Sequence, residues 1–232
     1  MAKRPTSKKR LASTRRPSAS LNPAQPGFEP ANKGLKYPVE VLTEDEAMAL
    51  IRSCSRRAPT GIRNKALIVL LWRAQLRIQE VLDLTPKDVD RDQYTLRVLH
   101  GKGDRARTVG LDDGAVAILE QWLEKRRSLG INGRGTRPLF CTLEGGKLDA
   151  SYVRRMLNRM AKRAGIDKRV HPHGLRHTGA SELRSEGVDI GVISKQLGHS
   201  SIATTARYLD HINPTVVIET MRRRSWSMGP KK

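Results

Sequence analysis

The sequence predicts a mainly α-helical domain with a small antiparallel β-sheet, which is an α+β class. Apolar residues recur at intervals of three and four in most segments after residue 37, as helices require. Two β-rich runs flank a glycine-containing turn within residues 94–111, which indicates a hairpin. Strands and helices do not alternate along the chain, so nothing favours a doubly wound parallel sheet.

The helices of the first half are predicted from their caps and apolar spacing. Thr43 with Glu46 forms a capping-box pattern that opens a helix through about Arg57. A second helix follows and contains ALIVLL, which is apolar on most sides and is therefore expected to be buried centrally. The segment AQLRIQEVLDL, residues 74–84, is predicted to be helical until the Thr-Pro pair at 85–86 interrupts it.

The second half begins with the predicted hairpin and then returns to helices. The hairpin is expected to carry Lys102 at its tip, within the sequence GKGD. Asp112 or Asp113 is predicted to cap the next helix. Further helices are expected from about Ser151 to Ala164, from about Pro172 to Ser185, and as two short helices within residues 189–209 that are split at Gly198-His199.

The charge of the chain predicts a nucleic-acid partner. Lys and Arg number 44 against 23 acidic residues, which gives a net charge of +21. Phosphate contacts and counterion release account for such an excess, although a ribosomal-type or merely soluble basic protein would also carry it. Only three Trp, four Tyr and two Phe occur, and single-strand binders depend on stacking aromatics, so duplex is favoured.

Other classes of protein are disfavoured by composition. No run of about 18 apolar residues occurs, so no membrane partner is expected. The two cysteines, Cys54 and Cys141, form no CxxC pair and are expected to be reduced, partly buried residues of a cytoplasmic protein.

We predict three parts along the chain. Residues 1–36 hold nine Lys or Arg and one acidic residue without apolar periodicity, so they are predicted to be a disordered basic arm. That arm would lie along DNA phosphates, or else be a solvated tail or localisation segment. Residues 37–212 are predicted to be the functional domain, and residues 213–232 a tail that docks on a neighbouring protomer, contacts DNA or is disordered.

The stretch HPHGLRH, residues 171–177, combines three histidines with an arginine. His173 and His177 are four apart, as in zinc-binding helices, but Gly174 stands where the catalytic Glu would be, so no metal or other cofactor is expected. A plain capped helix starting at Pro172 would also account for the stretch. A third interpretation is an anion site, since His173 and Arg176 share a helix face near its N-terminus.

A second arginine, Arg77, stands within an otherwise apolar helical segment, where it is not expected to be buried without a partner. Its guanidinium matches phosphate oxygens as that of Arg176 does, and Glu80, three residues on, would orient it. A simple surface pair of Arg77 with Glu80 explains the same spacing equally well.

Four sequence boxes occur in one order: QLRIQEVLDL with Arg77, HGKGDRARTVGL with Lys102, HPHGLRHTGAS, and LGHSSIATTARYL with His199 and Tyr208. Together they resemble the tyrosine recombinase, or phage integrase, family from about residue 41 to 212. The resemblance implies a mainly helical catalytic domain that cuts and rejoins duplex DNA without metal or ATP. It also implies two or four protomers assembled on DNA, with an accessory DNA-bending or directionality protein as a further partner.

The resemblance also implies roles for individual residues. Tyr208 would attack phosphorus to give a 3′-phosphotyrosine and a free 5′-hydroxyl, and His173 would assist its deprotonation, since the pKa of a free tyrosine is about 10. Arg77 and Arg176 would clamp the nonbridging oxygens, with His199 as a further donor. Lys102 would protonate the leaving oxygen, with Lys147 of the EGGK turn as its rival, and Glu80 would orient Arg77.

The sequence departs from the family pattern in three places. Ala74-Gln75 stand where Thr-Gly is usual, which is expected to affect the local turn and not Arg77. Gly179 replaces a bulky residue, which is expected to loosen packing. The basic arm stands where the family commonly has a helical domain that closes around DNA, so we expect either a minimal recombinase or a clamp supplied by another chain.

Two alternatives remain from the sequence. Residues 189–209 also fit a helix-turn-helix of a non-enzymatic DNA-binding regulator, but that leaves Arg77, Lys102 and the His173–Arg176 pair unexplained. A related enzyme that relaxes supercoils, as type IB topoisomerases do, or one that resolves hairpin ends would use the same covalent intermediate.

Overall fold

The computed structural model describes residues 40–99, 106–131, 137–209 and 221–222. The predicted arm, most of the predicted tail and Lys102 lie outside the described residues, as do the side chains of Arg207 and Tyr208. In chain order the elements are α1 (Glu44–Arg52), α2 (Pro59–Trp72), α3 (Ile78–Asp83), the 3₁₀-helix η1 (Pro86–Asp88), β1 (Val89–Asp90), β2 (Thr95–Val98), β3 (Arg107–Gly110), α4 (Asp113–Ser128), α5 (Ala150–Arg163), α6 (Pro172–Ser185), α7 (Ile190–Leu197) and α8 (Ile202–Leu209).

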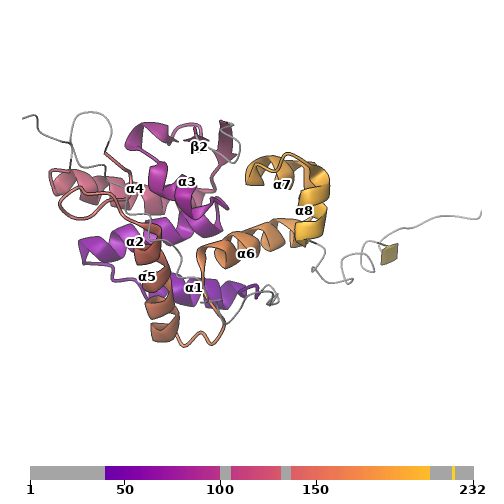
Figure 1. Cartoon of the computed structure of the whole chain (residues 1–232), viewed down its shortest axis with the longest axis horizontal. Helices are drawn as coiled ribbons and strands as arrows, with labels where there is room; N and C mark the ends of the chain where they lie inside the picture. The colour runs from indigo at the N-terminus through magenta and orange to yellow at the C-terminus, as the bar shows by residue number, and fades with distance from the viewer. Residues whose placement is uncertain (1–39, 100–105, 132–136, 210–220, 223–232) are drawn as a thin grey trace, which may run out of the picture. The chain divides into compact units, whose positions relative to one another are not determined.

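The predicted fold class is confirmed, because the described chain is mostly helical with a small antiparallel sheet (Figure 1). β2 and β3 pair in the predicted hairpin, with Leu96 opposite Val109. β1 was not predicted, since two residues are too few to show alternation; it adds to the other edge of β2 through Val89 opposite Leu96. The sheet order is therefore β1-β2-β3.

Two predicted helix boundaries are wrong. α1 starts with the predicted capping box but ends at Arg52 rather than near Arg57. The Ser55 hydroxyl instead accepts hydrogen bonds from the backbone of Arg57 and Ala58, which favours a turn. The predicted helix over 74–84 shrinks to α3, because Gln75 adopts a left-handed backbone with φ of 47° that a helix cannot contain.

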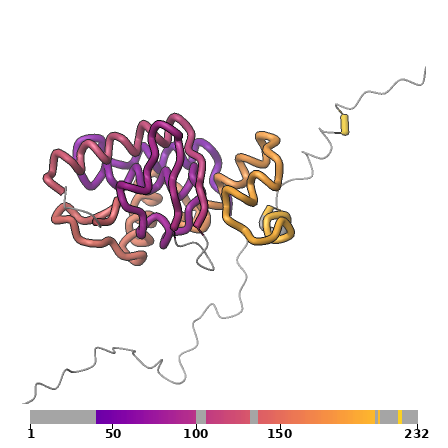
Figure 2. The backbone as a smooth tube through the Cα atoms, turned by 90° about the horizontal axis from the view of Figure 1, so that it is seen from above, coloured from indigo at the N-terminus to yellow at the C-terminus, as the bar shows by residue number. Residues whose placement is uncertain are grey.

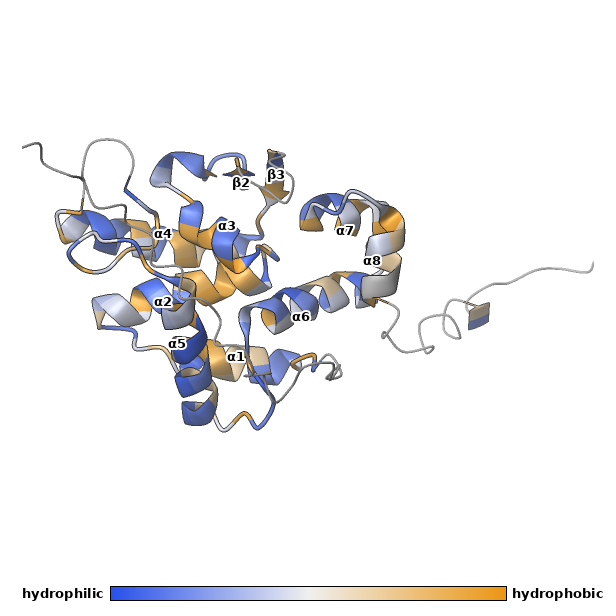
Figure 3. Ribbon diagram, in the orientation of Figure 1, coloured by the Kyte–Doolittle hydropathy of each residue, from blue (hydrophilic) through white to orange (hydrophobic). Residues whose placement is uncertain are grey.

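The main hydrophobic core surrounds α2, as its all-round apolar sequence predicted. Ten of its residues are buried, and it packs against α4, α6, α3 and α1. Figure 3 shows hydrophobic segments concentrated on α2 and its neighbours, while the outer face of α5 is hydrophilic. Trp122 of α4 and Phe140 are fully buried in the same core, together with Cys54 and Cys141, which are both free thiols.

A second and much smaller hydrophobic cluster joins α6, α7 and α8. Its buried members are Ala180, Ile193, Leu197 and Leu209. α6 packs against α2 in the main core and against α7 and α8 here, so it connects the two clusters (Figure 1). Figure 2 shows α7 and α8 beside the sheet, and β3 contacts α7. No helix in the described part of the chain is long and apolar enough to cross a membrane.

Polar side chains at the end of α2 bind α6 and α4 to it. Arg73 pairs with Asp112, the N-cap of α4, at 2.6 Å and with Glu182 of α6 at 2.9 Å. The indole nitrogen of Trp72 donates to the same Glu182 carboxylate at 2.8 Å. These bonds fix the C-terminal end of α2, from which the chain turns toward Arg77.

The expectation that Gly179 loosens packing is wrong. A Cβ atom at this position of α6 would lie 2.0 Å from the carbonyl oxygen of Trp72, which is closer than any real contact. α6 and the end of α2 therefore approach each other more closely at Gly179 than any larger residue would permit.

Candidate active site

Arg77 is the N-cap residue of α3 and not an interior helical residue as predicted. Its backbone N–H and its Nη1 atom both donate to Glu80, at 2.8 and 2.7 Å. Among the described residues its guanidinium contacts Glu80 alone, and 28% of the side chain is exposed. Glu80 therefore lies where it can orient the Arg77 side chain. Part of the Arg77 side chain remains exposed to solvent.

Glu80 is buried and also binds a residue that the sequence did not single out, Arg107 of β3. The two guanidinium Nη atoms of Arg107 donate to the two carboxylate oxygens, each at 2.9 Å. Burial alone would raise the pKa of Glu80, but the bonds from Arg107 and Arg77 outweigh it and hold the pKa at about 2. Glu80 is therefore a carboxylate at neutral pH, shared by two arginines.

Arg107 also ties the hairpin to the end of α7. Its Nε atom donates to the carbonyl oxygen of Gln196 at 3.4 Å. Gly198, which ends α7 in the left-handed conformation with φ of 64°, lies so close that a Cβ there would meet Arg107 Cδ at 2.7 Å. β3 is thus fixed both to Glu80 and to the carbonyl of Gln196 near the end of α7.

Arg176 is almost completely buried, with 2% exposure. Its Nη1 atom donates to the backbone carbonyl of Gln75, and its Nη2 atom donates to the carbonyl of Leu197 at 2.7 Å. The same Nη2 atom lies 3.4 Å from Nε2 of His199. Arg176 therefore joins the turn before α3, the end of α7 and a histidine, which is a constrained position for a cation.

The two histidines of α6 contact each other. Nε2 of His173 lies 3.2 Å from Nε2 of the buried His177, and the rings are edge to face. Partial desolvation, and then the charge of Arg176, lower the pKa of His173 below its ordinary 6.5. His173 is exposed, and with this lowered pKa its ring is mostly neutral at pH 7 and can accept a proton.

His199 connects the site to the last helix. Its Nδ1 atom lies 2.9 Å from the hydroxyl of Thr205, a fully buried residue of α8. Burial, together with the charges of Arg176 and Arg77, lowers the pKa of His199 to about 4. Tyr208 follows Thr205 by three residues in the same helix. His199 thus lies beside Arg176, is affected by the charge of Arg77, and contacts the helix that carries Tyr208.

The two candidate general acids differ in what the structure describes. Lys102 lies outside the described residues, between β2 and β3. Lys147 forms an isolated antiparallel β-bridge with Cys141, and its Nζ atom pairs with Asp83 at the surface, at 2.8 Å. The ammonium group of Lys147 is therefore paired with the last residue of α3, whereas Arg77 precedes the first residue of that helix.

Hydrogen bonds and charge interactions link the predicted site residues Arg77, Glu80, Arg176, His173 and His199 in the structure. The structure adds Arg107, Thr205, His177 and the backbone of Gln75. No signal in the sequence pointed to Arg107, because it is 27 residues from Glu80 along the chain. No group of three or more His, Cys, Asp or Glu in the described ranges could hold a metal ion.

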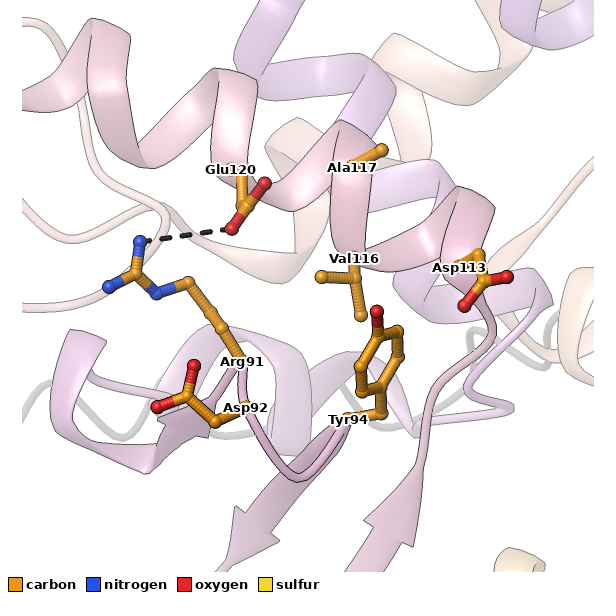
Figure 4. Close-up of a pocket in the computed structure, with 7 residues that line it drawn as sticks. All are labelled: Arg91, Asp92, Tyr94, Asp113, Val116, Ala117 and Glu120. Carbon is orange, nitrogen blue, oxygen red and sulfur yellow. Dashed lines mark ion pairs between the residues drawn. The ribbon is translucent and has the colours of Figure 1, made fainter.

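A surface hollow of about 570 Å³ lies apart from these residues, between the β1–β2 turn and α4 (Figure 4). Arg91 and Glu120 line it and pair at 3.8 Å, and Tyr94 stands at its edge. None of the predicted site residues lines it.

Solved structures of recombinases share this fold. The crystal structure of XerA recombinase aligns with a TM-score of 0.70 and 34% identity, covering 82% of this chain and 68% of that one. XerH recombinase, in a post-cleavage complex with a palindromic difH substrate, aligns with a TM-score of 0.65 and 28% identity over 82% of this chain and 54% of that one. The fold is therefore that of a site-specific recombinase.

The sequence comparisons give the family. The phage integrase family model matches residues 40–213, so the chain belongs to the phage integrase family. Tyrosine recombinase XerC of Corynebacterium efficiens is 37% identical over 69% of this chain and 50% of its own length. XerD of Mycobacterium tuberculosis is 36% identical over 72% of this chain and 55% of its own. The chain spans about half the length of the curated relatives it matches.

Proposed function

We propose that this protein is a site-specific recombinase that cuts and rejoins duplex DNA by transesterification through a 3′-phosphotyrosine, without metal or ATP. The observation that carries the proposal is the surroundings of His199. This neutral imidazole lies beside Arg176 and hydrogen-bonds Thr205 in the helix that carries Tyr208. The charge of Arg77 contributes to its lowered pKa.

The proposed roles follow from the charges and fixed positions of these groups. Arg77 and Arg176 bind the nonbridging oxygens, where negative charge grows as phosphorus becomes pentacoordinate. Their fixed acceptors, Glu80 for one and the carbonyls of Gln75 and Leu197 for the other, hold them in place before the substrate arrives. Preorganised cations of this kind lower the barrier because they need no rearrangement during the reaction.

We assign the two proton transfers to His173 and Lys102. Tyr208 attacks phosphorus as His173 accepts its proton, and the 5′-oxygen leaves as Lys102 donates one. His199 donates a hydrogen bond to a nonbridging oxygen. The energy of the broken phosphodiester is retained in the phosphotyrosine bond, so attack by another 5′-hydroxyl rejoins the strand.

The proposed partner is duplex DNA. XerH, at 28% identity, is seen bound to a difH substrate, and this chain carries a net charge of +21. One face of α5 is exposed and basic and could bind phosphates, through Arg154, Arg155, Arg159, Lys162 and Arg163.

The proposal assigns a role to each of the three predicted parts of the chain. Residues 37–212 form the catalytic domain, the basic arm 1–36 follows DNA phosphates, and the tail 213–232 docks on a neighbouring protomer. The assembly is a dimer or tetramer on DNA, helped by an accessory DNA-bending or directionality protein, in the cytoplasm at the nucleoid.

The alternatives fit fewer observations. A helix-turn-helix regulator would need neither the carboxylate shared by Arg77 and Arg107 nor the buried Arg176. A topoisomerase-like or hairpin-resolving enzyme would share the site, but the relatives and solved structures described above are named as recombinases.

The test is capture of a covalent adduct. The protein is expressed in its native host and the cells are lysed in denaturant, which stops the reaction. The DNA that remains attached to the protein is then sequenced. We expect adducts at a small number of sites, lost in Tyr208→Phe and kept in the control Tyr94→Phe, whose ring is 43% exposed. DNA binding without any Tyr208-dependent adduct would refute the proposal, and so would loss of cleavage on treatment with a metal chelator.

A further inference from the structure

Gln75 has a backbone conformation that its residue type rarely adopts. Its φ is +47°, and Tyr94, with φ of +53°, is the other non-glycine residue with positive φ in the described part of the chain. Tyr94 lies on an exposed turn, whereas Gln75 is 2% exposed between α2 and α3. A buried left-handed residue with a long side chain is unfavourable unless its surroundings compensate.

The side-chain amide of Gln75 supplies that compensation. Its Nε2 atom donates to the carbonyl oxygens of Trp72 and Arg73, at 3.1 and 2.7 Å. These carbonyls are at the end of α2, where a helix leaves its last acceptors without internal partners. The other amide atom, Oε1, is buried without a partner among the described residues. The hydrogen bonds that hold the side chain are therefore those that its Nε2 donates.

Gly179 of α6 provides the space for this arrangement. A Cβ atom there would meet the Trp72 carbonyl at 2.0 Å, and it would meet Nε2 and Cγ of Gln75 at 2.8 and 3.1 Å. A glycine inside a helix costs stability relative to alanine, so its presence here fits a need for close approach. Both Gln75 and Gly179 depart from the family pattern, and the structure shows that the two departures touch each other.

The contact bears directly on Arg176. Its guanidinium donates to the backbone carbonyl of Gln75, and Arg176 and Gly179 are three residues apart on one face of α6. We propose that Gln75 is a positioning residue for Arg176, and that Gln75 and Gly179 form one matched unit. The amide of Gln75 locks the left-handed turn, and the locked turn fixes the carbonyl that holds the guanidinium. The inference rests on the proposed role of Arg176 in binding the scissile phosphate.

The matching of the two residues is tested by stability alone. In the unchanged protein Gly179→Ala should lower the melting temperature strongly, because the new methyl group meets Gln75 and a tethered carbonyl. In a Gln75→Gly background the clash with the Gln75 side chain is gone and only the clash with the Trp72 carbonyl remains, so the same change should lower the melting temperature less. Equal losses in both backgrounds would overturn the matched unit.

The positioning role is tested by single-turnover cleavage of a captured target site at saturating DNA. A positioning defect lowers the rate constant while the fraction of molecules that react stays complete, whereas a folding defect lowers that fraction. We expect Gln75→Gly to lower the rate constant by about ten- to a hundredfold with full amplitude and unchanged DNA affinity. Gln75→Glu, which keeps the shape but loses the donor, should do the same.

The matched control is Tyr94→Gly, which makes the same kind of change at the other left-handed position and should leave the rate unchanged. A Gln75→Gly variant with a normal rate constant, or one that loses only amplitude, would overturn the positioning role. Failure of the proposed function looks different: no Tyr208-dependent adduct forms at all, while the melting-temperature comparison still decides whether Gln75 and Gly179 act together.

Discussion

The residues around Glu80 and those around His199 lie in one site but are supported differently. Glu80 and Arg77 are on α3, which adjoins the large core around α2, and Arg107 joins them by two 2.9 Å bonds. His199 and Thr205 belong to α7, α8 and the turn between them, whose hydrophobic cluster has four buried residues. One side of the site is held by a full core and a buried ion pair, and the other by little apolar packing.

This difference suggests a division of tasks. The groups proposed to bind phosphate should stay fixed, because their value lies in being preorganised. The helix that carries the proposed nucleophile has fewer buried contacts and should open locally at lower free energy than α2 or α4. Arg176 connects the two sides, since it binds the Gln75 carbonyl on one and the Leu197 carbonyl on the other.

The largest expected effect is on the firmly held side. Glu80→Gln removes the charge that Arg107 and Arg77 share and leaves the largely buried Arg107 without its carboxylate partner, which should cost about 3–5 kcal/mol of unfolding free energy. Asp83→Asn is the matched control on the same helix, because its pair with Lys147 is at the surface and should be worth less than about 1 kcal/mol. Similar costs in urea unfolding for both variants would contradict the account.

The stability of the two hydrophobic clusters can be compared by substituting one buried leucine in each. Leu67 of α2 and Leu197 of α7 are both fully buried. Leu67→Ala should lower the global unfolding free energy by about 2–5 kcal/mol. Leu197→Ala should leave global unfolding nearly unchanged, while amide hydrogen exchange in α7 and α8 speeds up and adduct formation slows. If both variants lower global stability equally, the two clusters unfold as one unit.

The smallest expected effect is the pH dependence from His199. Its pKa is about 4 in the folded protein against an ordinary 6.5, so the unfolded chain binds the proton more readily. Stability should therefore be constant above pH 6.5 and fall as the pH decreases toward 4.

His199→Gln should flatten part of that slope, and the lowered pKa of His173 accounts for a further part. Glu80, with a pKa of about 2 against an ordinary 4.5, adds its own loss only below pH 4.5. Between pH 6.5 and 4.5 the slope combines the histidines with Glu182, whose pKa is raised by burial, so the contribution of His199 is read from the difference between the unchanged protein and His199→Gln. An unchanged slope in His199→Gln would show that its ring does not lose its proton on folding.

The fold could be predicted because its elements leave local patterns, and local patterns also indicated the candidate site residues. Capping boxes, apolar spacing and the turn at GKGD predicted the helices and the hairpin, and the four boxes predicted Arg77, Glu80, Arg176, His173 and His199. The predicted helix over 74–84 was wrong because nothing local shows that Gln75 is left-handed; that conformation depends on hydrogen bonds to Trp72 and Arg73 and on space at Gly179.

Contacts between distant segments were the other part that sequence could not supply. Arg107 and Glu80 are 27 residues apart, and Arg176 and Gln75 are 101 apart, so neither bond follows from helical or strand periodicity. Gly179 was interpreted as loose packing because a small side chain suggests space. The structure shows the opposite, since the backbone of α2 fills that space.

The most direct test of the central claim is the chemistry of the cleaved DNA ends. A trapped adduct is digested with nuclease and protease, the modified peptide is identified by mass spectrometry, and the released strand is treated with polynucleotide kinase. The account predicts a nucleotide joined through its 3′-phosphate to Tyr208 and a 5′-hydroxyl end that the kinase labels without prior phosphatase treatment. A nucleotide on any other residue, or a 5′-phosphate at the cut, would contradict it.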